Sequence, residues 1–404
     1  MRYSRAVQKE LAKAFGVDRI WSYSRISTFV NCPWEYKVKY IDHVRDAGNV
    51  YSFYGTQCHN IIQGFYDGVY TYDQMSTEYT DFVRQWMDDQ DHFNFPKSKD
   101  GSDKTEKSYI KNLTHYFKNT QVVDTSNGIE IHNEEPVLVQ IPKDDNPAAF
   151  VLVGYIDSLY KDGDDIYLLD YKTSSKSGFT GKKLIEHSQQ LRLYSIGIHQ
   201  QKGIPYDKIN PRFDMMKYVK IRFKQENGKW KETIQERASW VSGIATKLKT
   251  KLKKAGLGPL ELQQAIDLAD AHGNLDNLPE SVQKQFEVGN CYIDVEINEE
   301  IAAETLKNHA DTITEIMRRE ACDPATYPEV FERDLAPFQN SLMFGHMAEA
   351  LSKETIDYTD DAGKKQVSNV VDLVSLFKPQ GADNGKEKPE EPGNSLERLG
   401  LHVS

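Results

Sequence analysis

The chain has 404 residues, 39% hydrophobic and 11% aromatic, which fits one large domain or two and excludes wholesale disorder. Its formal net charge of -11 and pI near 5.6 argue against a protein coated in basic surface for binding nucleic acid. Because the mean hydropathy is -0.64, no apolar run reaches the roughly 18 residues of a membrane helix and the N-terminus lacks a signal peptide, we expect a cytoplasmic protein without a membrane partner.

The first quarter of the chain predicts helices. Residues 1–21 are expected to be an N-terminal extension, followed over 21–45 by a loop and a helix that Pro33 interrupts. Ser24 or Ser27 is the expected N-cap, because a serine hydroxyl accepts a backbone N–H that has no partner inside the helix. Helical periodicity then predicts an insertion over about 60–125, with helices beginning near residue 55 and covering 73–90 and 105–119.

At residue 129 the spacing of the apolar residues changes from a helical period to that of a strand. Apolar alternation and β-branched residues predict three strands, over 129–141, 148–160 and 166–174. The later elements are expected to be a helix over 185–201, a strand over 211–223, a turn and a long helix over 227–254, a strand over 291–297 and a helix over 299–321. This order predicts an α/β fold, a mixed central sheet flanked by helices with helical insertions, and a C-terminal helical part over about 230–350. The polar residues 379–404 predict a disordered acidic tail.

The most informative stretch is GYIDSLYKDGDDIYLLDYKTSS, residues 154–175. Because side chains alternate along a strand, Asp170 and Lys172 should share one face, with Tyr171 opposite. If Asp162 and Gly163 form the hairpin turn, Asp157 becomes a diagonal neighbour of Asp170.

Two carboxylates so close in apolar strands are unfavourable unless a positive charge lies between them. Magnesium or manganese suits such oxygen ligands, and Lys172 could position a metal-bound water. The alternative is a hairpin whose Asp and Lys side chains form a solvated salt-bridge face.

Five sequence blocks argue against the alternative of a solvated salt-bridge hairpin. They are S-x-S-R-I-S-T-F-x-N-C-P (22–33), G-x-x-x-H (55–59), G-Y-I-D (154–157), D-Y-K-T (170–173) and Q-L-R-L-Y (190–194). In this order they resemble the RecB-like branch of the PD-(D/E)xK nucleases. The resemblance implies a restriction-endonuclease-like core within 22–378 and a metal-dependent DNA nuclease in recombination, repair or replication, with exonuclease favoured over endonuclease, in a bacterial or phage-infected cell.

The resemblance also implies site residues. Those that would ligate Mg²⁺ or Mn²⁺ are His59, Asp157, Asp170 and, through its backbone carbonyl, Tyr171. Those that would complete the active site are the catalytic Lys172 and the substrate contacts Gln190 and Tyr194.

Two choices stay open. Glu134 or Glu135 could be an accessory acid, with Glu135 preferred, and Gln189 could replace Gln190, although the spacing to Tyr194 favours Gln190.

Several relatives hold an iron–sulfur cluster with four cysteines. Cys32 stands where the first would be, but only Cys291 and Cys322 follow downstream of the strands, so no cluster is expected. With Cys58, these form no CxxC pair, and four reduced, mostly buried thiols are predicted.

Two other function classes compete with the nuclease. One is a catalytically inactive nucleic-acid-binding module of the same fold. The other is a glycoside hydrolase with two carboxylates, which would leave Lys172 and His59 without a role.

Partner surfaces beyond the DNA substrate are less defined. A lysine cluster, Lys247, Lys249, Lys251, Lys253 and Lys254, is either a solvated helix face or a surface that follows a phosphate backbone. The absence of a Walker A sequence means that any helicase activity belongs to a partner, and a single-strand-binding protein is another possible partner. In the segment 368–380, Leu373, Leu376 and Phe377 resemble a sliding-clamp peptide, the alternative being a segment packed on the core.

Overall fold

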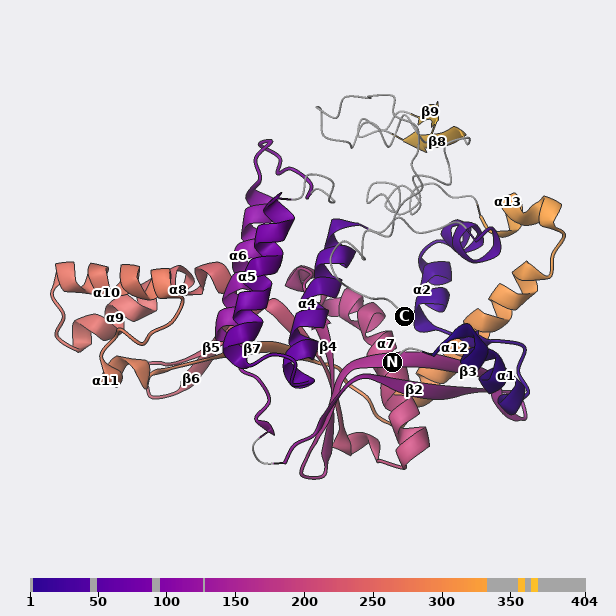
Figure 1. Ribbon diagram of the computed structural model, residues 1–404, viewed down its shortest axis with the longest axis horizontal. Coiled ribbons are helices and arrows are strands. Elements are labelled where there is room, and N and C mark those ends of the chain that lie inside the picture. Colours follow the sequence, from indigo (N-terminus) through magenta and orange to yellow (C-terminus); the bar gives the residue numbers. More distant parts are fainter. Residues whose placement is uncertain are drawn as a thin grey trace.

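The computed structural model describes residues 3–43, 49–88, 95–125 and 128–332, together with the backbone of two paired strands, β8 (Thr355–Thr359) and β9 (Lys365–Asn369). A seven-stranded mixed sheet forms the centre of the fold (Figure 1). Its strands are β1 (Ile20–Trp21), β2 (Ile131–Lys143), β3 (Asn146–Asp162), β4 (Asp165–Lys172), β5 (Ile209–Lys224), β6 (Trp230–Glu236) and β7 (Phe286–Asp294). The predicted α/β class with a mixed central sheet is confirmed.

The strand order is β1-β3-β4-β5-β6, with β2 also paired to β3 and β7 to β5. β3 and β4 form an antiparallel hairpin, whereas β4 and β5 are parallel and are joined through helix α7 (Gly181–Lys202). This crossover sets α7 against the sheet beside the end of β4, which brings the Q-L-R-L-Y block close to the D-Y-K-T block.

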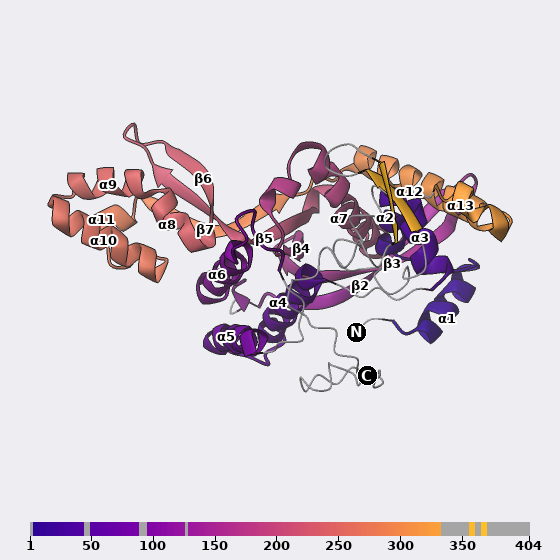
Figure 2. The same cartoon turned by 90° about the horizontal axis from the view of Figure 1, so that it is seen from above.

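Helices cover both faces of the sheet (Figure 2). One face packs against α7 and the helices α2 (Tyr23–Asn31), α3 (Pro33–Tyr36) and α12 (Glu299–Glu320), with the short α13 (Tyr327–Val330) beyond them. Helix α1 (Arg5–Phe15) contacts β1 and β3. The other face packs against α4 (Val50–Tyr66), α5 (Tyr72–Asp88) and α6 (Lys104–Asn119). The two faces therefore have separate apolar cores, one on each side of the hairpin that carries the aspartates.

A third core lies at one end of the molecule, where the distal halves of β5 and β7 extend away from the other two (Figure 1). Its helices are α8 (Trp240–Gly243), α9 (Ala245–Lys254), α10 (Pro259–His272) and α11 (Glu280–Gln283). We call this unit, residues 219–288, the distal lobe. It has its own buried apolar residues, including Trp240 and Leu248.

Helix α7 packs closely on the sheet because a glycine lies at the contact on each side, one in the helix and one in β3. A Cβ added at Gly197 of α7 would meet Val137 and lie 2.8 Å from the carbonyl oxygen of Leu138. A Cβ added at Gly154 of β3 would overlap the ring of Tyr194 on α7. Since real side chains cannot share that space, both positions require glycine for this packing.

The hairpin register differs from the prediction by two residues. Asp162 pairs with Asp165 and Leu159 with Leu168, so the turn consists of Gly163 and Asp164 instead of Asp162 and Gly163. Gly163 has φ of 60°, whereas Asp164 is not among the residues with positive φ. Positive φ at the first loop residue alone matches a type II′ hairpin turn, which favours glycine in that place. A shift of two residues keeps every side chain on its predicted face.

Two local predictions are wrong. Ser22, not Ser24 or Ser27, caps α2, and its side chain accepts a hydrogen bond from the Arg25 backbone N–H. The residues from Trp230 to Glu236 form β6 instead of the start of a helix. They pair with β5 over their whole length, and this tertiary pairing overrides their Lys- and Glu-rich, helix-like composition.

The structure describes the cysteines and most of the predicted helices, but it does not describe residues 370–404. All four cysteines are free, and Cys32, Cys58 and Cys291 are buried. Among the described residues, no helix has the length and apolar character needed to cross a membrane. The tail over 379–404 and the residues Leu373, Leu376 and Phe377 lie outside the described part of the chain.

Candidate functional site

The predicted aspartates meet at the open end of the β3–β4 hairpin. The ladder ends with Ser158 opposite Leu169, so Asp157 and Asp170 are the next residues on the two strands. Asp170 is only 5% exposed, and Oδ2 of Asp157 accepts a hydrogen bond of 3.0 Å from the backbone N–H of Tyr171. The corrected register therefore brings the two carboxylates closer than the predicted diagonal pairing.

These carboxylates carry more negative charge than their surroundings neutralise. Burial and the charge of Asp170 raise the pKa of Asp157 to about 6, against the opposing effects of His59 and Lys172. Nζ of Lys172 lies 2.5 Å from Oδ2 of Asp170, yet this buried oxygen has no well-formed hydrogen bond among the described residues. One lysine is thus shared by two acids, and the arrangement favours an additional cation.

Lys172 remains protonated in this site. Burial lowers its pKa, but the carboxylates of Asp170 and Asp157 outweigh that effect and raise the pKa above the ordinary value. Its side chain is 29% exposed, so the ammonium group is held beside Asp170 and still reaches solvent. It lies on the predicted face with Asp170, while Tyr171 packs into the core beneath α4 and α6.

Helix α4 supplies His59. Its Nε2 lies 2.8 Å from the carbonyl oxygen of Tyr171, and its Nδ1 lies 3.5 Å from Oδ2 of Asp157. A Cβ at Gly55 would lie 3.4 Å from Oγ1 of Thr173, an ordinary van der Waals contact, so α4 packs on the end of β4 at this position. The histidine one turn later then reaches Tyr171.

Helix α7 supplies the other two predicted residues. Nε2 of Gln190 donates a hydrogen bond of 3.1 Å to the Tyr194 hydroxyl. Burial raises the pKa of Tyr194 to about 12, and the nearby charges of Asp170 and Asp157 add to the shift. Gln189 instead donates to the carbonyl oxygen of Ile185 in its own helix, so Gln190 is the residue that the structure places next to Tyr194.

The accessory acid stays a prediction. Glu135 lies in β2 opposite Ile156, and Glu134 has left-handed backbone with φ of 49°. Both side chains are partly exposed.

The donor set fits a hard divalent cation. Two carboxylates, a backbone carbonyl and an imidazole converge here, and the buried Oδ2 of Asp170 lies 2.5 Å from Nζ of Lys172. In the part of the chain that the structure describes, however, no group of three or more His, Cys, Asp or Glu side chains is already arranged as a metal cluster. The four ligands named from the sequence therefore stay a prediction.

A cleft of about 700 Å³ borders these residues on the side of α4 and α6, and His59 and Lys172 lie in its wall. Its lining includes Tyr109 and Lys217, which the sequence analysis missed. Lys217 belongs to no motif, and its only sequence signal is a cation inside the apolar strand stretch MMKYV.

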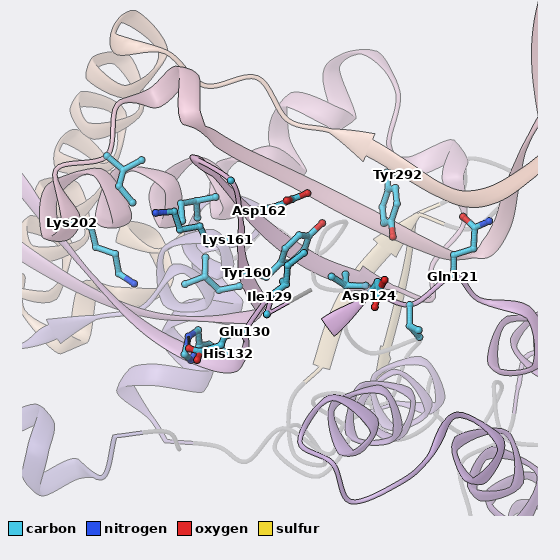
Figure 3. A pocket seen from close by; sticks show the side chains of 17 residues that line it. Gln121, Asp124, Ile129, Glu130, His132, Tyr160, Lys161, Asp162, Lys202 and Tyr292 are labelled. Carbon is cyan, nitrogen blue, oxygen red and sulfur yellow. Dashed lines mark ion pairs between the residues drawn. The ribbon is translucent and has the colours of Figure 1, made fainter. Parts of the chain in front are cut away.

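A larger cavity of about 1040 Å³ lies at the opposite, turn end of the hairpin. Figure 3 shows Tyr160, Lys161 and Asp162 beside Lys202 and Tyr292 in its wall. The residues that line it include none of the predicted site residues, so we do not assign the site to it.

The lysine cluster lies on α9 in the distal lobe, away from this cleft (Figure 2). Nζ of Lys247 lies 5.0 Å from the centroid of the Phe223 ring, and Lys254 forms a 2.5 Å ion pair with Glu226. Lys249 and Lys253 are exposed. The cluster is thus partly engaged within the lobe, and its role in phosphate binding stays a prediction.

Comparison with known families identifies the fold and its chemistry. The family model of the PD-(D/E)XK nuclease superfamily matches residues 20–273, a range that includes every candidate site residue. No curated protein sequence matches the chain. The match disfavours the glycoside hydrolase alternative, because the matched superfamily consists of nucleases. Since the matched range covers more than half of the 404 residues, the chain belongs to the PD-(D/E)XK nuclease superfamily.

Proposed function

We propose that this chain is a magnesium- or manganese-dependent DNA exonuclease of the RecB-like branch. The observation that supports the proposal most directly is the cluster of Asp157, Asp170 and Lys172, in which Asp170 is buried and its Oδ2 lies 2.5 Å from Nζ of Lys172. A catalytically inactive binding module would have no need to keep two largely buried acids beside a single lysine, since the arrangement is unfavourable for stability.

Each site residue has a defined task. Asp157, Asp170, His59 and the carbonyl of Tyr171 would hold the metal. The bound ion would supply Lewis-acid polarisation of the phosphate and a lowered pKa for water. The backbone N–H of Tyr171 fixes the carboxylate of Asp157 through their 3.0 Å hydrogen bond.

The lysine and the α7 pair act on the substrate. Lys172, held by Asp170, donates a hydrogen bond to the attacking water and offsets the charge that develops on the phosphate. Gln190 keeps the Tyr194 hydroxyl in place through their mutual hydrogen bond, and the pair contacts the substrate strand.

Preference for DNA, digestion from an end, and a place in recombination, repair or replication are supported by the five ordered sequence blocks. The same resemblance suggests a helicase, a single-strand-binding protein or a sliding clamp as a partner.

The test uses linear DNA labelled at either end, beside a closed circle, with magnesium, manganese or EDTA. We expect the linear DNA to be degraded with either metal, the circle to persist and EDTA to stop the reaction. Asp170→Asn should abolish cleavage and retain binding. Asp165→Asn is the matched control, because Asp165 lies at the other end of β4, where its carboxylate pairs with Lys208 at 3.6 Å. Cleavage that persists in EDTA or in Asp170→Asn would refute the proposal.

A further inference from the structure

The cleft beside the candidate site is lined by groups that bind oxyanions. It lies where α4 and α6 face the ends of β4 and the middle of β5. Hydroxyl side chains are frequent in its wall, among them Ser52, Thr56, Ser108 and Thr173. The hydroxyls of Ser52 and Thr56 already donate to backbone carbonyls at the N-terminal end of α4, and that of Ser108 donates to Glu236. The groups of the wall that attract an oxyanion are therefore its cations, Lys217 and Lys172.

A strand irregularity directs Lys217 into this cleft. Between two paired positions β5 advances by five residues, from Asp214 to Val219, while β7 advances by only two. Met216 packs into the core under α4 and α6, and the next residue, Lys217, also faces that side, with Nζ 4.6 Å from the centroid of the Tyr109 ring. Regular alternation would place Lys217 on the opposite face, so the bulge re-aims this side chain into the cleft.

The ammonium group of Lys217 has no ion-pair partner among the described residues. Burial lowers the pKa of Lys217, and the charge of Glu236 partly opposes that shift. Tyr109 is 4% exposed, and its hydroxyl lies beside Thr173 in the cleft wall. The one nearby acid, Glu236, is already held by Nδ2 of Asn112 at 3.3 Å.

We propose that Lys217 binds a backbone phosphate of the substrate strand other than the phosphate that is cleaved. The proposal rests on the proposed function, because the cleaved phosphate lies at Asp157 and Asp170. A phosphate supplies both a negative charge and acceptor oxygens for the ammonium group of Lys217. The contact adds affinity for the strand without touching the phosphate that is cleaved.

The test measures binding of a single-stranded oligonucleotide in EDTA to the Asp170→Asn protein at several salt concentrations. Adding Lys217→Met should weaken binding at least fivefold and reduce the slope of log K against log salt by about 0.7, the value for one lost phosphate contact on a single strand. Lys220→Met is the matched control, since Lys220 lies on the same strand but pairs with Glu232 at 4.0 Å. That control should leave the slope unchanged.

Two further measurements sharpen the result. Glu236→Gln should strengthen binding, because it removes the negative charge nearest to Lys217 in the cleft. In the cleaving protein, Lys217→Met should raise KM and leave kcat nearly unchanged, as expected for a contact made equally in the ground and transition states.

The outcomes separate the two proposals. If the Asp170→Asn protein binds no nucleic acid, the proposed function fails. If it binds and Lys217→Met changes neither affinity nor slope in a protein that melts like the parent, the phosphate site is refuted and the proposed function stands. Oligonucleotides with and without a 5′-phosphate distinguish the source, because an effect that disappears with the 5′-hydroxyl strand assigns the site to a terminal phosphate.

Discussion

Replacing Gly154 with alanine tests whether the position of Tyr194 matters for activity. The new methyl group would overlap the Tyr194 ring, which is 6% exposed and has little free space to move into. Overpacking of this kind costs about 1–3 kcal/mol of stability. The displaced ring would also move its hydroxyl away from Gln190, with which it now forms a 3.1 Å hydrogen bond. A displacement of about 1 Å near a reacting centre can reduce the rate about 100-fold.

Gly197→Ala is the matched control for this substitution. It overpacks the same interface between α7 and the sheet, but its new methyl group meets Val137 and the carbonyl of Leu138 instead of a site residue. Urea denaturation should show both variants destabilised by about 1–3 kcal/mol. Initial rates on end-labelled DNA, measured where both proteins are folded, should fall only for Gly154→Ala. A Gly154→Ala protein with wild-type stability and rate, or an equal loss of rate in Gly197→Ala, would refute the reasoning.

Three more predictions concern other parts of the structure. Burial lowers the pKa of His115 to about 4, and its Nδ1 has no partner among the described residues. The unfolded chain therefore takes up a proton that the folded chain resists, so stability should be lost as pH falls from 6.5 towards 4, by up to about 3 kcal/mol. Urea denaturation at pH 7 and pH 4.5 should show a smaller loss in His115→Gln, and an equal loss would contradict the assignment. Oδ1 of Asn290 accepts a 2.8 Å hydrogen bond from the buried guanidinium of Arg237, so Asn290→Ala should cost about 3 kcal/mol in the same assay. A cost near zero would show that Arg237 finds another partner. Lys172→Met should retain DNA binding and lose cleavage on the end-labelled substrate, and residual cleavage above a tenth of wild type would exclude Lys172 as the catalytic lysine.

Strand alternation predicted much of the site, because it depends only on local geometry. The pairing of Asp170 with Lys172 on one face and the position of Tyr171 opposite follow from the two-residue period, and an error of two residues in the register leaves both intact. The turn itself was misplaced because Asp-Gly suits two different turn frames, and the pairing of Asp162 with Asp165 decides between them.

The local sequence pattern could not predict which strands pair when they lie far apart in the chain. The bulge that directs Lys217 into the cleft arises because β5 pairs with β7, a strand more than seventy residues later in the chain. The strand β6 was likewise assigned to a helix, since its partner β5 and not its composition decides its conformation. The proximity of His59 to Tyr171 depends on α4 packing over β4, which the motif resemblance implied and the hydrophobic pattern alone did not.

The connection between β5 and β7 has a consequence for how this protein could have changed during evolution. Phe223 and Phe286 are cross-strand partners, and the backbone N–H of Lys224 donates a 2.9 Å hydrogen bond to the carbonyl of Gln285. The intervening residues, with β6 and the helices from α8 to α11, thus begin and end at adjacent points. A tight turn could join those points, so this segment is placed where a module can be exchanged as a unit, provided that its replacement also supplies the buried guanidinium of Arg237, which hydrogen-bonds Asn290 and lies over the Tyr116 ring.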